Sequence, residues 1–171
     1  MRWRSASGVL CLAVLLTPAT ALAQDRVLAP RDSALVADYL RVLEAKFLRR
    51  DQRPLELLAD TAYVVVTPGG ILETRTLALR GIQNFRLDSA TLTNPQVLRD
   101  GDLAILTAEL RLVGALEARS PGGAIRRVEL TGPYRVLATF VAAPGVPARL
   151  LAESVTPVRA PGAPTTIPPR P

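Results

Sequence analysis

The chain has 171 residues and contains no histidine, while cysteine and tryptophan occur once each, as Cys11 and Trp3. Without an imidazole, Ser-His-Asp and Cys-His nucleophile systems and histidine-based zinc sites are excluded. No glycine-rich phosphate loop follows a predicted strand, and the acids Asp100 and Asp102 flank a tight turn, which explains them without a metal. We therefore predict no metal site and no cofactor.

Long hydrophobic runs are also missing, because the apolar segment Gly8–Leu16 is well short of the roughly 18–20 residues that span a bilayer. It follows a short basic start and precedes the small-residue site Ala21-Leu22-Ala23. These three parts are typical of a secretory signal peptide. We predict a signal peptide over residues 1–23, cleavage between Ala23 and Gln24, and a periplasmic or extracellular location with no membrane span. The alternative, a retained N-terminal anchor, is disfavoured by Pro18.

If cleavage occurs, both Cys11 and Trp3 are lost, and no disulfide can form in the mature chain. Residues 24–31 are then a short linker. At the other end, Arg159–Pro171 contains five prolines and no hydrophobic periodicity, which predicts a disordered tail. A proline-rich docking peptide is the alternative for this tail.

The formal net charge is +6, and Lys46 is the only lysine among the basic residues. The arginines are scattered among acids, with no basic run and no interleaved aromatic residues. This pattern predicts no nucleic-acid binding.

Helical signals dominate the first part of the chain. Asp32 and Ser33 can cap a helix whose apolar residues recur at helical spacing: Val36, Tyr39, Leu40, Leu43 and Phe47. A second, short helix is predicted over 55–59, a strand over 61–67 with a short partner at 71–73, and a third helix over 74–80 that Gly81 stops.

The second half predicts strands at about 87–98, 103–114, 125–141 and 148–157, joined by short turns as an antiparallel meander. The central strand alternates: Ala104, Leu106, Ala108, Leu110 and Leu112 share one face, and Thr107, Glu109 and Arg111 share the other. We predict an α+β fold in which the N-terminal helices pack on the apolar face of a curved antiparallel sheet. The polar face is either a solvated surface with ion pairs or a dimer interface.

This order of elements resembles the nuclear transport factor 2-like (NTF2-like), or SnoaL-like, superfamily of cone-shaped α+β folds. The local phrases that carry the resemblance are Asp51 before Leu57-Leu58-Ala59-Asp60, the segments Gly70–Arg75 and Asp100–Ile105, and the final strand Leu150–Val158 with its Thr-Pro. The resemblance covers residues 32–158. It implies a cone fold in which related isomerases use an Asp base with Tyr and Asp donors.

Two kinds of site are compatible with that fold. The first is non-catalytic: small residues on the apolar sheet face could leave room for a small apolar ligand, with contacts expected from Tyr39, Tyr63, Phe85, Ala108 and Tyr134. The alternative for these residues is a tightly packed core, with the tyrosine hydroxyls reaching its rim. The alternative is an isomerase or hydrolase that uses a buried carboxylate and tyrosines, and its candidate acids are Asp38, Asp60 and Glu153. We favour the non-catalytic hypothesis, with a homodimer as the assembly. A third hypothesis is an envelope interaction module that uses the sheet face and tail.

Overall fold

The computed structural model describes residues 28–119 and 123–158, so the predicted signal peptide and proline-rich tail lie outside the described residues. Its helical elements are α1 (Pro30–Glu44), the π-helical turn η1 (Ala45–Arg49), α2 (Arg53–Leu58), α3 (Arg75–Gly81) and the 3-10 turn η2 (Ile82–Asn84). Its strands are β1 (Ala59–Val66), β2 (Leu72–Thr74), β3 (Phe85–Asp100), β4 (Leu103–Arg119), β5 (Ile125–Glu129), β6 (Gly132–Val141) and β7 (Arg149–Pro157).

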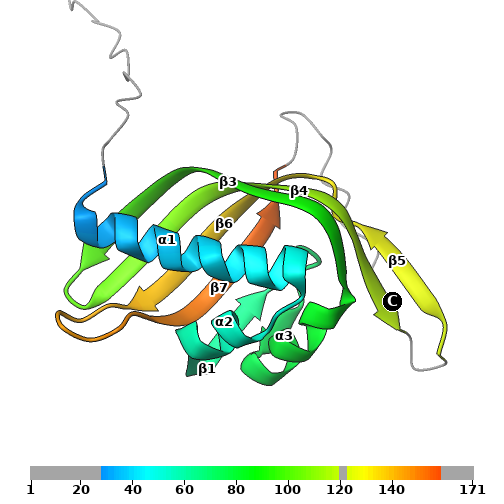
Figure 1. The fold of residues 1–171 in the computed structure, drawn as a ribbon, viewed down its shortest axis with the longest axis horizontal. Coiled ribbons are helices and arrows are strands. Elements are labelled where there is room, and N and C mark those ends of the chain that lie inside the picture. The colour runs from blue at the N-terminus through cyan, green and yellow to red at the C-terminus, as the bar shows by residue number, and fades with distance from the viewer. Residues whose placement is uncertain (1–27, 120–122, 159–171) are drawn as a thin grey trace, which may run out of the picture.

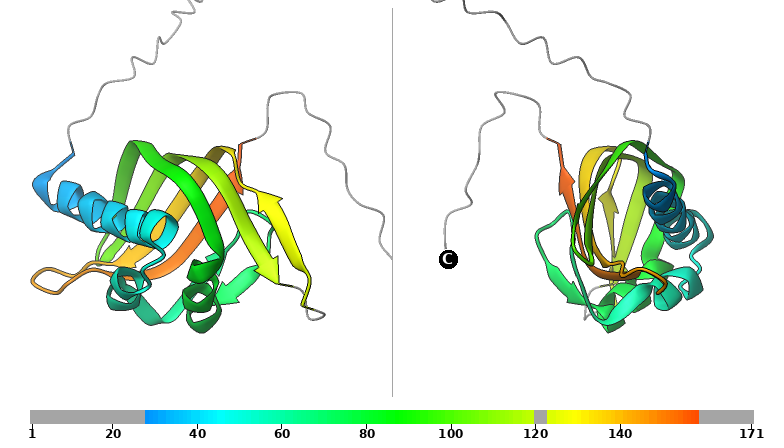
Figure 2. Two further views of the ribbon diagram at one scale, coloured as in Figure 1. Left: turned by 45° about the vertical axis from the view of Figure 1, so that its right-hand side comes forward. Right: turned by 90° about the vertical axis from the view of Figure 1, so that its left-hand side faces the viewer.

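The strands form one seven-stranded sheet in the order β2-β1-β7-β6-β4-β3, and β5 pairs with the far part of β4. Neighbouring strands are antiparallel from β3 through β4 and β6 to β7. The next pair, β7 with β1, is parallel. Figure 1 shows α1 lying across the inner face of these four strands. The turned views in Figure 2 show the sheet curling around the helix as a half-barrel.

β-Bulges bend the long strands. The pairing of β3 with β4 shifts between Leu87 and Ser89, opposite Gly114. Gly114 has a φ of +135°, and a Cβ there would lie 2.4 Å from the carbonyl oxygen of Arg86. The position therefore requires glycine, and the tight crossing helps to set the curvature of the sheet.

The core lies between α1 and the inner face of the sheet. Pro30 suits the first turn of α1, where no backbone N–H is needed. The helix buries Leu35, Val36, Tyr39, Val42 and Leu43. The ring of Tyr39 meets that of Phe140 edge-on, with ring centres 6.0 Å apart. Burial of each large apolar side chain contributes about 1.5–3 kcal/mol, so this interface holds the helix inside the curved sheet.

The alternation predicted along residues 103–114 is confirmed: Ala104, Leu106, Ala108, Leu110 and Leu112 are buried, while Glu109 and Arg111 are exposed. Other details differ from the sequence-based prediction. The first helix begins at Pro30 with Ala29 at its N-cap, because Asp32 pairs with Arg99 instead of capping. The third helix includes Gly81, which has ordinary helical dihedral angles, and continues into η2. The strand predicted over 125–141 divides at Gly132, whose φ is +149°, into β5 and β6.

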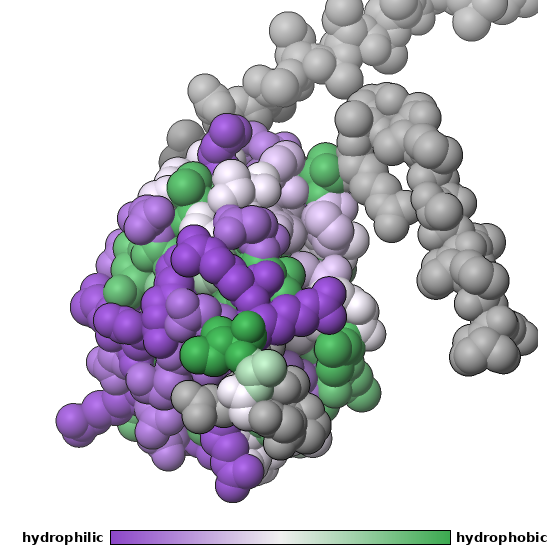
Figure 3. Space-filling model, turned by 90° about the vertical axis from the view of Figure 1, so that its right-hand side faces the viewer, coloured by the Kyte–Doolittle hydropathy of each residue, from purple (hydrophilic) through white to green (hydrophobic). Residues whose placement is uncertain are grey.

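Figure 3 views the molecule from the end where β4 and β5 project, and it shows mostly hydrophilic side chains with hydrophobic residues in separate groups. The ion pair between Arg127 Nε and Glu129 Oε1, at 3.0 Å, lies on β5 and is exposed. Within the described part of the chain, no helix is long and apolar enough to cross a membrane.

Candidate functional site

A carboxylate lies inside the curved sheet. Glu153 on β7 is only 2% exposed, although strict alternation from buried Leu150 would turn residue 153 outward. The pairing with β6 jumps from Phe140↔Leu150 to Thr139↔Ala152, which leaves Leu151 as an extra residue. This bulge changes the parity of the strand, so Glu153 points inward.

Three side chains from different elements meet this carboxylate. The hydroxyl of Tyr39, on α1, donates a hydrogen bond of 3.1 Å to Glu153 Oε1, and that of Tyr63, on β1, donates one of 2.8 Å to Oε2. Lys46 Nζ, on η1, lies 3.6 Å from Oε1. All three partners are buried. We call these four residues the Glu153 cluster.

The electrostatics of the Glu153 cluster keep both tyrosines protonated. Burial raises the pKa of Tyr39, and the nearby negative charge of Glu153 raises it further. Burial likewise raises the pKa of Tyr63, with Glu153 again the second cause. Both hydroxyls are therefore permanent donors near neutral pH, and each is already bonded to the carboxylate. Lys46 supplies the compensating positive charge that a buried carboxylate needs.

The polar groups of the Glu153 cluster face one another. Each carboxylate oxygen accepts a tyrosine hydroxyl, and Oε1 also faces Lys46. An acid or base that acts on a substrate must have an oxygen within reach of the reacting proton. Glu153 is only 2% exposed, so a substrate could reach either oxygen only after the surrounding side chains move. The geometry is that of a buried polar network which ties α1, η1, β1 and β7 together.

Lys46 was not among the residues predicted to form a site. It follows Leu35, Tyr39 and Val42 at helical spacing, so it falls on the same buried face of the helix as these residues. A lone lysine on an apolar helical stripe is the signal that would have found it.

The other candidate acids lie on the surface. Asp38 forms an exposed pair with Arg41, at 2.8 Å. Asp60 accepts a hydrogen bond of 2.9 Å from the backbone N–H of Ala62, and this bond lowers the pKa of the Asp60 carboxyl. The partners of both acids lie outside the Glu153 cluster.

Of the five predicted ligand contacts, Tyr39, Tyr63 and Tyr134 belong to the buried core, Phe85 packs against it, and none of the five lines the α1-end pocket. Tyr39 and Tyr63 meet at Glu153, as described. Phe85 packs edge-on against Phe47, with ring centres 4.8 Å apart. Tyr134 is a buried core residue of β6, and Ala108 lies in the middle of β4.

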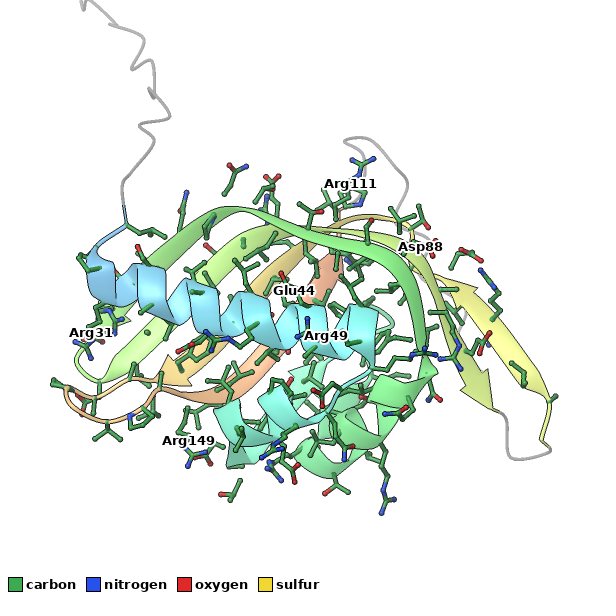
Figure 4. All side chains as sticks on the ribbon, viewed as in Figure 1. Arg31, Glu44, Arg49, Asp88, Arg111 and Arg149 are labelled. Atoms are coloured by element: carbon green, nitrogen blue, oxygen red, sulfur yellow. The ribbon has the colours of Figure 1, made fainter. Side chains whose placement is uncertain are left out.

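A pocket lies at the N-terminal end of α1. Its volume is about 610 Å³, and we call it the α1-end pocket. It is an open pocket bordered by α1, the end of β3 and the β6–β7 loop, and its wall consists of Arg31, Ala34, Leu35, Asp38, Arg99, Ala142, Ala143, Pro144, Gly145, Val146, Pro147 and Ala148. Figure 4 shows Arg31 at this end of the helix, beside the loop. Its Nη2 donates to the carbonyl oxygen of Ala142, which links α1 to that loop.

Acidic side chains do not assemble a metal site anywhere in residues 28–119 and 123–158, since no three of them gather closely enough to hold an ion. The α1-end pocket and the Glu153 cluster are the two places considered below as candidate sites.

A helix held within a strongly curled sheet defines an α+β cone. Solved structures share it. An NTF2-like protein from Cytophaga hutchinsonii superposes with a TM-score of 0.62 at 15% identity, over 77% of this chain and 100% of that one. The CaMKII hub of S. rosetta superposes with a TM-score of 0.57 at 18% sequence identity, over 77% of this chain and 100% of the hub chain. A candidate dehydratase of the NTF2-like family from Streptomyces avermitilis superposes with a TM-score of 0.56 at 19% sequence identity, over 76% of this chain and 97% of that one.

The chain therefore has the NTF2-like fold, and the resemblance predicted from the sequence is confirmed at the level of the fold. No protein-family model matches the sequence, and no curated protein matches it. The solved structures differ in what their names describe, so the fold leaves the activity open.

Proposed function

We propose that the chain is an exported NTF2-like domain that binds a small, largely apolar molecule without transforming it, and that the ligand occupies the α1-end pocket. The observation that carries this proposal is the contrast between the two candidate places. The polar groups of the Glu153 cluster bond to each other, whereas the α1-end pocket is open and mostly lined by Ala, Leu, Val and Pro.

The size of the pocket supports this proposal. Its 610 Å³ lies within the range of about 300–1,000 Å³ that small-molecule sites occupy. Apolar walls with a few polar groups are the usual composition of such sites, because burial provides affinity and the polar groups fix orientation.

A fluorescence titration with N-phenyl-1-naphthylamine, a small neutral apolar dye, tests the proposal. We expect the mature protein to enhance its emission saturably. Ala34→Phe places a ring in the pocket, because Ala34 is part of its wall, and should weaken binding at least about tenfold, or about 1.4 kcal/mol.

The matched control is Ala37→Phe, which makes the same change at an exposed position of α1 outside the pocket wall. This variant should bind the dye as the parent does. Equal loss in both variants, equal binding in all three proteins, or no saturable binding by the parent would each overturn the proposal.

A second candidate function is acid–base catalysis at Glu153. The observation in its favour is a buried carboxylate between two tyrosine hydroxyls on the inner face of the cone. The Kemp elimination of 5-nitrobenzisoxazole reports an accessible carboxylate base. A rate above background that Glu153→Gln abolishes, and that Glu129→Gln on the exposed strand β5 does not, would replace the binding proposal with this one.

We also propose that the domain forms a homodimer through the outer face of the sheet. The support is the mixed-charge surface of β4 and β6, where Glu109 lies opposite Arg135. Two such faces can pair acid with base in an isologous contact. The alternative role as an envelope interaction module would use the same face with a different partner.

A further inference from the structure

A second pocket adjoins the α1-end pocket farther along α1. Its volume is about 360 Å³, and its wall includes Val42 on α1 and Pro54 and Leu57 on α2, so we call it the α2 pocket. The walls of the two pockets have three residues in common, Asp38, Pro147 and Ala148. The two pockets therefore form one groove, which is bordered by α1, the β6–β7 loop and α2 (Figure 1).

The groove follows one stripe of the first helix. Its α1 residues recur three or four positions apart, from Arg31 through Leu35 and Asp38 to Val42. Residues at this spacing lie one above another on the same face of a helix. From Arg31 to Val42 the helix rises about 16 Å, at about 1.5 Å per residue, which matches the extended length of an alkyl chain of about ten to twelve carbons. The groove is thus elongated, and a compact molecule would occupy only one of its two pockets.

Hydrogen bonds hold the borders of the groove together. Arg31 links α1 to the β6–β7 loop through the carbonyl oxygen of Ala142. Arg149 Nη1, at the start of β7, donates a hydrogen bond of 2.9 Å to the carbonyl oxygen of Leu57 and so links the other end of that loop to α2. The groove is therefore formed before a ligand arrives, which lowers the entropic cost of binding.

The composition of the groove favours an uncharged occupant. Val146 in the α1-end pocket is 62% exposed, and Leu57 in the α2 pocket is 67% exposed. Where the two pockets meet, the carboxylate of Asp38 is paired with Arg41 at 2.8 Å. An aliphatic chain in the groove would cover both exposed apolar side chains and leave this ion pair in place.

From these observations we propose that the groove binds one unbranched aliphatic chain in an extended form, which runs along α1 from the α1-end pocket into the α2 pocket. This inference rests on the proposed function and specifies the class of its ligand, a free single-chain molecule of about ten carbons or more. A compact ring system would gain nothing from the α2 pocket.

Competition against N-phenyl-1-naphthylamine tests the inference, with 1-hexanol and 1-decanol as probes that differ only in chain length. Each additional methylene that is buried strengthens binding about fourfold. We expect 1-decanol to displace the dye from the mature protein at least about a hundredfold more effectively than 1-hexanol, because its four additional methylenes extend into the α2 pocket.

Leu57→Asp places a carboxylate in the wall of the α2 pocket, where a bound aliphatic chain would remove water from it. This variant should lower the preference for 1-decanol to less than about tenfold and leave displacement by 1-hexanol unchanged. The matched control is Leu77→Asp, which makes the same change at an exposed leucine of α3 outside both pocket walls. It should keep the full preference.

Pro54→Asp is a second variant of the same wall, at the start of α2, where an acidic side chain suits the first turn of a helix. It should lower the preference for 1-decanol in the same way as Leu57→Asp. If Leu57→Asp does not fold, Pro54→Asp alone decides.

The outcomes separate this inference from the function on which it rests. A preference below about tenfold in the parent protein overturns the extended chain and leaves the α1-end pocket standing as an apolar site. A full preference that survives in either wall variant overturns the role of the α2 pocket, and so does an equal loss in Leu77→Asp. Failure of the dye and of both alcohols to bind overturns the proposed function.

Discussion

The two tyrosines of the Glu153 cluster determine how the fold responds to alkali. Their pKa values are raised in the folded state, whereas those of unfolded tyrosines are about 10. Below about pH 10 both states hold the protons, so this contribution to stability is complete. Above it the unfolded chain releases protons that the folded chain retains, so the free energy of unfolding falls by about 1.4 kcal/mol per pH unit for each tyrosine.

Replacing Tyr63 by Phe removes one of these two groups. The alkaline decline in the free energy of unfolding should therefore be shallower in Tyr63→Phe by about 1.4 kcal/mol per pH unit. Urea unfolding at several pH values above about 10 measures both slopes, with the same proteins at neutral pH as the reference. Identical slopes in the variant and the parent would contradict the raised pKa of Tyr63.

Only part of this site could be predicted at the level of residues. Tyr39 was placed on the buried face of a helix by its spacing, and the structure buries it. Glu153 was a candidate acid, but alternation along the final strand gave no reason to turn it inward, because the bulge at Leu151 depends on pairing with β6. Lys46 was missed, although its spacing from Tyr39 and Val42 puts it on the same buried face of the helix.

At the scale of elements, the curvature of the sheet depends on Gly114. We expect Gly114→Ala to lower the free energy of unfolding by about 2–3 kcal/mol, because the added Cβ would collide with backbone atoms of β3 and the backbone there has a positive φ. Thermal unfolding measures the change. Gly101→Ala is an informative comparison: it also has a positive φ, but a Cβ there would meet no neighbouring atom.

Gly101→Ala should thus cost only the strain of its turn, and Gly114→Ala should be the more destabilised of the two. The reverse order would show that the crossing of β3 and β4 is not tightly packed. The sequence indicated β4 by its alternation. It did not indicate the bulges, because an extra residue on one strand is defined only relative to its partner.

At the scale of the whole molecule, the predicted cleavage after Ala23 determines the mass of the secreted protein. If residues 1–23 are a signal peptide, the secreted product begins at Gln24, and it shows no tryptophan fluorescence because Trp3 has been removed. Intact mass spectrometry of the secreted protein measures both ends of the chain. Ala23→Leu, which enlarges the small residue before the cleavage site, should leave the segment attached. A secreted parent protein that still contains Trp3 would contradict the prediction.

The order of elements along the whole chain was predictable because turn residues and hydrophobic periods separate them clearly. The pairing of β1 with β7 was not, because nothing local to either strand specifies a neighbour so distant in sequence.

That parallel pairing bears on the order of folding. Within the sheet, the strand that contains Tyr63 has only the short β2 and the last strand, β7, as neighbours. Its partner in the Glu153 cluster lies 90 residues later, and that of Tyr39 lies 114 residues later. The first half of the chain therefore cannot complete its core until the last strand has been synthesised. We expect slow folding, as contacts so distant in sequence produce, and a nascent chain that remains open long enough to be threaded through a translocation channel.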